Sequence, residues 1–201
     1  MSIFKCSVGQ KYTIAGIIEY ITQSEKSEPE YVFTTGTDIK HVVSDATFIQ
    51  IMFRDRKLSH KEYHQFISVL SPTDISPTGL DRFCQYIAAL HYTLSRWPDL
   101  PQPEFQIITA IHFDKAPIYH AHTIVFTPSV KDGHSFPWDK KHFWLLMNLV
   151  NRLFLYYGFT PIQDKRLNEL STIPNFFNGI VPASLSITPE AVRDSKSRKS
   201  L

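Results

Sequence analysis

Ile107–Thr127 reads IITAIHFDKAPIYHAHTIVFT and consists of two strand-like runs separated by a short Asp-Lys-Ala-Pro connector. Side chains alternate between the two faces of a strand, so His120 and His122 share one face. If the runs form a hairpin centred on Ala116, His112 lies directly opposite His120. Cross-strand partners point to the same face, with Cβ atoms about 5 Å apart. The stretch therefore predicts a metal site built from three imidazoles.

Two neighbours of these histidines bear on the predicted metal site. Small Ala110 is expected opposite His122, which leaves room for an ion. Asp114, in the connector, could accept a hydrogen bond from a ligand imidazole, or it could be an ordinary turn residue. A structural zinc site would use a fourth protein ligand, and the sequence offers none, so open coordination positions are expected. Ligand chemistry alone favours zinc, manganese, cobalt or nickel over magnesium.

Length and composition indicate an ordinary globular chain. Its 201 residues, 43% of them hydrophobic, suffice for one well-packed domain. The formal net charge of +2 is small for a nucleic-acid binder, so any basic surface must be local. Cys6 and Cys84 lack metal or disulfide spacing, which indicates a reducing compartment. Without a signal peptide or an apolar run of roughly 18 residues, we expect a soluble, cytoplasmic protein with no membrane insertion.

Hydrophobic periodicity predicts the remaining elements. Their order mixes strands and helices without regular βαβ alternation, which predicts an α+β domain on a mainly antiparallel sheet. Helix caps are expected at Thr13, at Ser44 or Asp45, and at Thr78, and Gly158 is expected to end the last long helix. Strands are expected at residues 3–8, 31–35 and 63–70. Helices are expected at residues 14–21, 44–54, 79–97 and 164–172, and a long one from Trp138 or Asp139 to Tyr157.

The end of the chain differs in composition from the rest. Four basic residues stand among serines there, so residues 191–201 are expected to form a basic, disordered tail after a domain spanning residues 1–190. An arm that binds DNA is the alternative. The basic residues are Arg193, Lys196, Arg198 and Lys199.

Three segments carry a resemblance to a known family. They are Ala15–Thr22 (AGIIEYIT) followed by Glu25–Ser27, then Tyr63–Ser68 (YHQFIS), then His112-x-Asp114 followed by His120-x-His122. In this order they resemble the motifs of relaxases, the DNA-nicking and strand-transferring nucleases of conjugative and mobilisable plasmids. Relaxases belong to the HUH (His-hydrophobic-His) endonuclease superfamily. The first segment resembles the MobP-like branch, and the resemblance runs from Gly16 to Pro161.

The resemblance implies a role for each motif residue. Tyr20 would be the nucleophile that nicks single-stranded DNA, forming a 5′-phosphotyrosyl intermediate and rejoining the strand by reverse transfer. Ser68 would contact DNA near the scissile phosphate, and Asp114 would assist at the site. The three histidines, His112, His120 and His122, would hold a divalent metal ion, with manganese or magnesium first and zinc, cobalt or nickel as alternatives.

The resemblance also implies a fold and partners. The fold would be palm-like, with helices packed on one face of the sheet and the histidine-lined site on the other. The partners would be single-stranded DNA at an origin of transfer, accessory relaxosome proteins and a coupling protein, in a bacterium that carries the gene on a plasmid or integrative element. Candidate DNA contacts, each equally consistent with ordinary solvated charge, are Lys26, Arg54, Arg56 and Lys57.

Three other functions stay open on the sequence. A replication-initiator or transposase-type HUH nickase would place its nucleophile on a downstream helix, where Tyr156 and Tyr157 are the candidates. A metal-dependent phosphohydrolase would use a bound water and form no covalent protein–DNA species. A catalytically inactive, DNA-binding relative would bind no metal.

Overall fold

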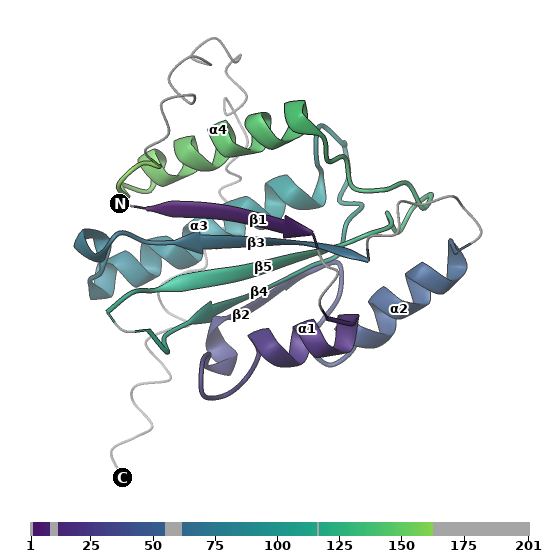
Figure 1. The fold of residues 1–201 in the computed structure, drawn as a ribbon, viewed down its shortest axis with the longest axis horizontal. Coiled ribbons are helices and arrows are strands. Elements are labelled where there is room, and N and C mark those ends of the chain that lie inside the picture. Colours follow the sequence, from purple (N-terminus) through teal and green to yellow (C-terminus); the bar gives the residue numbers. More distant parts are fainter. Residues whose placement is uncertain (1, 9–11, 55–61, 116, 163–201) are drawn as a thin grey trace. The chain divides into compact units, whose positions relative to one another are not determined.

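A five-stranded antiparallel sheet forms the centre of the structure, a computed structural model that describes residues 2–8, 12–54, 62–115 and 117–162. The strands pair in the order β1-β3-β5-β4-β2 (Figure 1). The described residues all belong to one compact unit, residues 1–171. The elements are β1 (Ile3–Val8), α1 (Ile14–Ile21), β2 (Val32–Thr35), α2 (Val42–Met52), β3 (Tyr63–Val69), α3 (Pro77–Ser95), β4 (Ile107–His112), β5 (His120–Phe126) and α4 (Lys140–Tyr156), with single 3-10 turns at Pro29–Tyr31 and Pro72–Asp74. The predicted α+β class with a mainly antiparallel sheet is confirmed.

Some sequence predictions fall outside this part of the chain. The predicted helix at residues 164–172 and the basic tail at residues 191–201 lie outside the described residues. The predicted limit of the main domain at residue 190 lies outside them too. No helix within the described residues is both long enough and apolar enough to cross a membrane.

The helix starts follow local chemistry. The Thr13 hydroxyl accepts a hydrogen bond from a backbone N–H of the first turn of α1, at 3.1 Å, as predicted. The prediction of Thr78 as the cap of α3 is wrong, because Ser76 has that place and Pro77 occupies the first helical position. A proline there costs no hydrogen bond, since the first N–H groups of a helix lack intrahelical partners. α2 begins at Val42, earlier than predicted.

One face of the sheet, called the histidine face below, carries His112, His120 and His122. α1 and α2 pack against the same face, because the isoleucines of α1 and the buried side of α2 need an apolar surface. The prediction that helices and histidines occupy opposite faces is therefore wrong for these two helices. The buried cluster that joins them to the sheet contains Ile14, Ile17, Ile18, Ile21, Val42, Ala46, Tyr63, Ile108, Ala110, Ile124 and Phe126.

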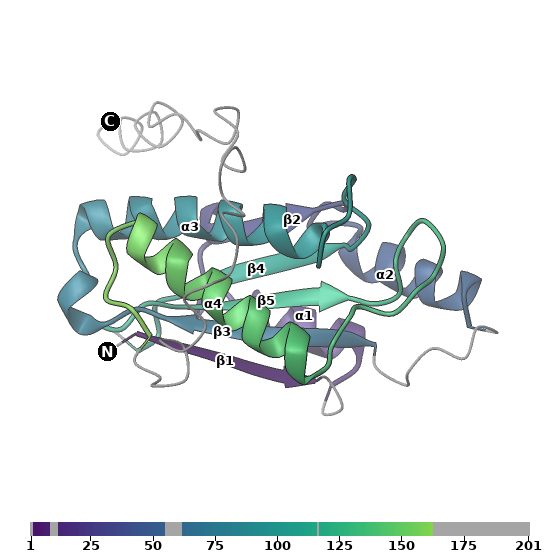
Figure 2. The same cartoon turned by 90° about the horizontal axis from the view of Figure 1, so that it is seen from above.

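The opposite face of the sheet packs against α3 and α4. Figure 2 shows these two helices alongside one another, and the Tyr86 and Phe154 rings stack between them with centroids 4.8 Å apart. Aromatic side chains fill the layer below, where the Trp138 ring lies edge-on to Phe66 at 5.5 Å. Large aromatic rings bury much apolar area each, so this layer contributes strongly to hydrophobic stabilisation.

A buried polar network links α3 to the sheet on this opposite face. The His91 Nε2 lies 2.6 Å from Thr109 Oγ1, and its Nδ1 lies 2.9 Å from Thr35 Oγ1. Thr109 in turn donates to Thr123 Oγ1 at 2.8 Å. Burial lowers the pKa of His91 to about 3. The imidazole is therefore neutral near neutral pH, with both nitrogens hydrogen-bonded.

Acidification is expected to destabilise the protein partly through His91. The folded imidazole stays neutral down to a pKa of about 3, whereas an unfolded histidine binds a proton below about pH 6.5. Between these values the unfolded state holds the extra proton, so the free energy of unfolding falls by about 1.4 kcal/mol per pH unit as the pH drops. Urea titrations at about pH 7 and pH 5 give the fall in the free energy of unfolding between the two pH values. This fall should be about 2 kcal/mol smaller for His91→Gln than for the wild type. Equal losses would contradict a neutral His91.

Candidate metal centre and nucleophile

The β4–β5 hairpin has the register that its sequence predicts. His112 pairs with His120, and Ala110 pairs with His122. The ring centroids are 5.1 Å apart for His112 and His120, 4.5 Å for His112 and His122, and 5.2 Å for His120 and His122. One nitrogen from each ring lies within 4.8 Å of the other two. The three imidazoles thus converge on one point of the histidine face.

Hydrogen bonds orient two of the rings and leave one nitrogen on each. His112 Nε2 donates to the Ile21 carbonyl at 2.8 Å, and His122 Nδ1 pairs with Gln65 Nε2 at 2.8 Å. His120 Nδ1 is buried and has no hydrogen-bond partner among the described residues. An imidazole that binds a metal uses one nitrogen for the ion and the other for a hydrogen bond. The bonding of His112 leaves its Nδ1 for an ion, whereas His122 would offer its Nε2 once the Gln65 amide turned its oxygen toward Nδ1.

The electrostatics of the three rings suit a cation. Burial, and after it the positive charges that His112 and His120 would carry, lower the pKa of His122 to about 3. Burial also lowers the pKa of His112 and of His120 below the usual histidine value. Neutral imidazole is the form that binds metals, so no proton has to leave at neutral pH. Three neutral imidazoles, one with an unpaired buried nitrogen, fit a divalent transition metal.

Asp114 lies beside the histidines, just after β4. Its Oδ1 is 3.8 Å from His120 Nε2, which is within ion-pair range but longer than a hydrogen bond. The carboxylate raises the pKa of both His112 and His120, against the larger effect of burial. The structure therefore brings Asp114 to the site. Its part in orienting His120 stays a prediction.

Tyr20 lies at the end of α1, next to the three histidines. Its ring is edge-on to His122 with centroids 5.7 Å apart, and to His112 with centroids 6.2 Å apart. The Lys26 ammonium lies 3.8 Å from the centroid of the Tyr20 ring, and the Tyr12 ring stacks on it at 5.8 Å. The bond between His112 and the carbonyl of the residue after Tyr20 ties this helix end to the triad.

The structure does not bring Ser68 to this site, so its predicted contact with DNA is corrected. Ser68 pairs with Ala121, between the two β5 histidines, and side chains of consecutive residues point to opposite faces. Ser68 is fully buried under α3, where its hydroxyl lies 2.8 Å from Tyr86 Oη. The strand instead presents Gln65 to the triad. Gln65 was not predicted from the sequence. The available signal was its distance of three positions from Ser68, because residues an odd number of positions apart in a strand point to opposite faces.

Ser68→Ala should lower stability and leave DNA chemistry intact. The substitution leaves the Tyr86 hydroxyl buried without its partner, which costs about 1–3 kcal/mol in the free energy of unfolding. Urea denaturation measures this loss. Adding Tyr86→Phe should recover part of it, because both polar groups of the pair are then gone. A Ser68→Ala protein of wild-type stability that no longer cleaves DNA would restore the original prediction.

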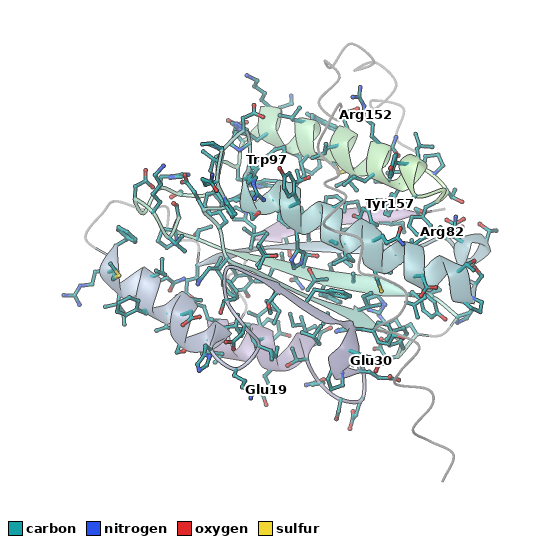
Figure 3. All side chains as sticks on the ribbon, turned by 180° about the vertical axis from the view of Figure 1, so that it is seen from behind. Glu19, Glu30, Arg82, Trp97, Arg152 and Tyr157 are labelled. Carbon is teal, nitrogen blue, oxygen red and sulfur yellow. The ribbon has the colours of Figure 1, made fainter. Side chains whose placement is uncertain are left out.

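Of the other candidate residues that the structure describes, Lys26 alone lies near the triad. Arg54 follows α2 and is exposed, and Arg56 and Lys57 lie outside the described residues. Tyr156 and Tyr157 end α4 on the opposite side of the sheet, where Arg82 donates to the Tyr157 carbonyl at 3.1 Å. Figure 3 labels Tyr157 beside Arg82, well apart from Glu19 of α1. This placement disfavours a nucleophile on the downstream helix.

A second group of possible ligands is already paired internally. It consists of Glu104, Asp132 and His134. Lys131 Nζ lies 3.3 Å from a Glu104 oxygen, and His134 Nδ1 lies 2.6 Å from an Asp132 oxygen. Hydrogen bonds from the backbone and ring of His134 lower the pKa of Asp132 to about 2. The members of this group are thus hydrogen-bonded to one another and to Lys131.

Comparison with known proteins gives a fold and no sequence relative. No protein-family model matches the chain, and no curated protein matches its sequence. A manganese-bound crystal structure of the MobM relaxase domain (MOBV; Mob_Pre) with 22-nucleotide oriT DNA of plasmid pMV158 matches with a TM-score of 0.54 and 12% identity, covering 87% of this chain and 96% of that chain. A manganese-bound structure of the same domain with a 3′-thiophosphate on the DNA matches at 0.54 and 11%, covering 86% and 93%.

These neighbours decide how far the predicted resemblance holds. They are relaxase domains of the MOBV class, so they support the predicted relaxase fold and give no support to the MobP-like branch. At 11–12% identity the likeness concerns the fold. The chain therefore has an α+β fold similar to that of the MobM relaxase domain.

Proposed function

We propose that this chain is a relaxase, an enzyme that nicks single-stranded DNA by attack of Tyr20 on a phosphodiester. One observation carries the proposal. The Tyr20 ring lies 5.7 Å from the ring of His122, beside three convergent, buried imidazoles. A phenol next to a possible cation site has the two parts that phosphoryl transfer needs, a nucleophile and an electrophile. The relaxase fold supports the same reading.

The proposed step exchanges one phosphodiester for another. Tyr20 Oη bonds to the scissile phosphorus, the bond from phosphorus to the 3′-oxygen breaks, and the phenolic proton ends on the 3′-hydroxyl. The products are a 5′-phosphotyrosyl DNA and a free 3′-hydroxyl. Little free energy is lost, because a phosphodiester is made for each one broken. Attack by the 3′-hydroxyl on the phosphotyrosine therefore rejoins the strand.

The histidine triad would hold the metal. His112, His120 and His122 supply three neutral nitrogens, and Asp114 would orient the His120 ring from 3.8 Å. A divalent cation there would withdraw negative charge from the non-bridging oxygens of the scissile phosphate. The manganese in the MobM structures supports Mn²⁺ as the first candidate, with Mg²⁺, Zn²⁺, Co²⁺ and Ni²⁺ as alternatives.

We propose that the Lys26 ammonium binds the scissile phosphate. This ammonium lies 3.8 Å from the centroid of the Tyr20 ring. Burial first, and the charge of Lys26 among the smaller causes, lower the pKa of His112 and of His122. A phosphodiester between Tyr20 and the triad would pair with this ammonium. Lys26 would thereby hold the strand for in-line attack.

The proposed substrate is single-stranded DNA at an origin of transfer. The MobM domain is bound to oriT DNA, which supports this class of substrate for a chain of the same fold. Accessory relaxosome proteins, a coupling protein and a cytoplasmic, bacterial setting complete the proposal, and they follow from the relaxase assignment alone.

The test is formation of a covalent protein–DNA species. The purified chain is incubated with Mn²⁺ and a random-sequence pool of single-stranded DNA labelled at the 3′ end, then run on a denaturing gel. Label that migrates with the protein supports the proposal. Shortened label without an adduct would indicate a phosphohydrolase that uses water, and uncut DNA would indicate a catalytically inactive relative. Either result overturns the relaxase proposal.

A further inference from the structure

We propose that Gln65 positions His122 for metal binding, an inference that rests on the proposed metal-dependent function. Gln65 lies on β3, in the strand next to the histidine hairpin. In the β3–β5 register, Ile67 pairs with His122 and Gln65 pairs with Ile124, so Gln65 and His122 share the histidine face. The Gln65 Nε2 and the His122 Nδ1 are 2.8 Å apart, in spite of the 57 residues between them in sequence.

This contact can set which nitrogen of His122 carries the proton. In the sense that the structure shows, the Gln65 amide N–H donates to Nδ1, so the ring proton is on Nε2. In the other, Nδ1–H donates to Gln65 Oε1, and Nε2 has a free lone pair. Only the second sense offers Nε2 to a cation, because a protonated nitrogen cannot bind a metal. A glutamine permits both, since its amide has a donor end and an acceptor end.

A second residue, Ser7, can hydrogen-bond to the Gln65 amide in either of its two orientations. The Ser7 hydroxyl of β1 lies 3.3 Å from Gln65 Oε1. A hydroxyl can donate or accept, so Ser7 can satisfy whichever end of the amide turns away from His122. The chain Ser7–Gln65–His122 crosses three adjacent strands. It needs no charged group next to the metal.

The three histidines have different partners, and Gln65 differs from the others in being a side chain hydrogen-bonded to one of the rings. His112 bonds to a backbone carbonyl, and the Asp114 carboxylate lies 3.8 Å from His120 Nε2. Within the described residues, Gln65 is the one side chain that hydrogen-bonds to a ring of the triad. Hydrogen bonds of this kind fix the orientation of metal ligands, and losing one weakens metal binding about 10- to 100-fold.

Manganese affinity tests the proposal without relying on activity. Free Mn²⁺ is measured by electron paramagnetic resonance during titration of the full chain with Mn²⁺ alone. Gln65→Met, which removes the amide and keeps the length, should weaken binding about 10-fold or more. Gln65→Glu should bind at least as tightly as the wild type, because its carboxylate accepts from Nδ1–H. The matched control is Gln50→Met, since Gln50 is also half-buried and uses its amide to bond two carbonyls away from the triad.

The outcomes separate this inference from the proposed function. Wild-type affinity in Gln65→Met would overturn the positioning role, and so would a loss in Gln65→Glu equal to the loss in Gln65→Met. A loss of the same size in Gln50→Met would also overturn it. If the wild type itself bound no Mn²⁺, the metal-dependent function would fail first. A wild type that binds Mn²⁺ and depends on His122, with Gln65→Met unchanged, would sink the inference alone.

Discussion

Tyr20→Phe should abolish covalent attachment of the protein to single-stranded DNA while leaving DNA affinity nearly unchanged. The substitution removes only the phenolic oxygen, so the ring keeps its packing against Tyr12, His112 and His122. Removing an essential nucleophile costs a nuclease about 1,000-fold or more in rate. Adduct formation with the 3′-labelled pool on a denaturing gel, together with filter binding of the same DNA, measures both effects.

Two matched tyrosine variants make this result specific. Tyr12→Phe alters the ring stacked on Tyr20 and should keep the adduct. Tyr157→Phe tests the downstream helix, which lies on the other side of the sheet, and should keep it as well. Adduct in Tyr20→Phe, or its loss only in Tyr157→Phe, would move the nucleophile to the position typical of replication initiators. Mapping the peptide that retains a nucleotide would then identify the residue.

His122→Ala should weaken Mn²⁺ binding on the order of 100-fold or more, since it removes a ligand itself and not merely a hydrogen bond to one. The His122 ring centroid lies 4.5 Å from that of His112 and 5.2 Å from that of His120. Among the described residues, no other histidine, cysteine or carboxylate joins this group of possible ligands. Free Mn²⁺ measured during titration gives the affinity. Adduct formation at micromolar Mn²⁺ should fall in parallel.

The control for this variant is His64→Ala. His64 is as buried as the triad but lies on the opposite face, against Phe136 and Trp138, with ring centroids 5.1 and 5.5 Å away. Its loss should lower the melting temperature and leave Mn²⁺ affinity unchanged. If His122→Ala kept wild-type affinity, the three imidazoles would not be the metal site, and the proposed mechanism would lose its electrophile.

The motif identified Tyr20 as a candidate, and the tertiary structure determined where Tyr20 lies relative to the triad. The resemblance to relaxases picked out Tyr20, but its place beside His112 depends on a contact across 91 residues of sequence, between His112 and Ile21. No local pattern specifies such a contact. It arises because the isoleucines of α1 must be buried on the face that also carries the histidines, which fixes where the end of that helix lies.

The sequence by itself determined the features that depend on neighbours along the chain. The register of His112 with His120 follows from the length of one short connector and from strand alternation. The start of α1 at Thr13 and its buried isoleucines follow from capping and from helical spacing. The left-handed Gly158 that ends α4 is equally local, because only glycine adopts a φ of 71° at little cost.

Only the tertiary structure decided which face of β3 meets the histidines. Alternation puts Gln65 and Ser68 on opposite faces of β3, but it does not tell which of these two faces carries the site. That choice depends on the pairing of β3 with β5, and on the aromatic layer under α3 and α4 that buries Ser68 against Tyr86. A strand shifted by one residue would exchange the two faces, and hydrophobic burial is what prevents the shift.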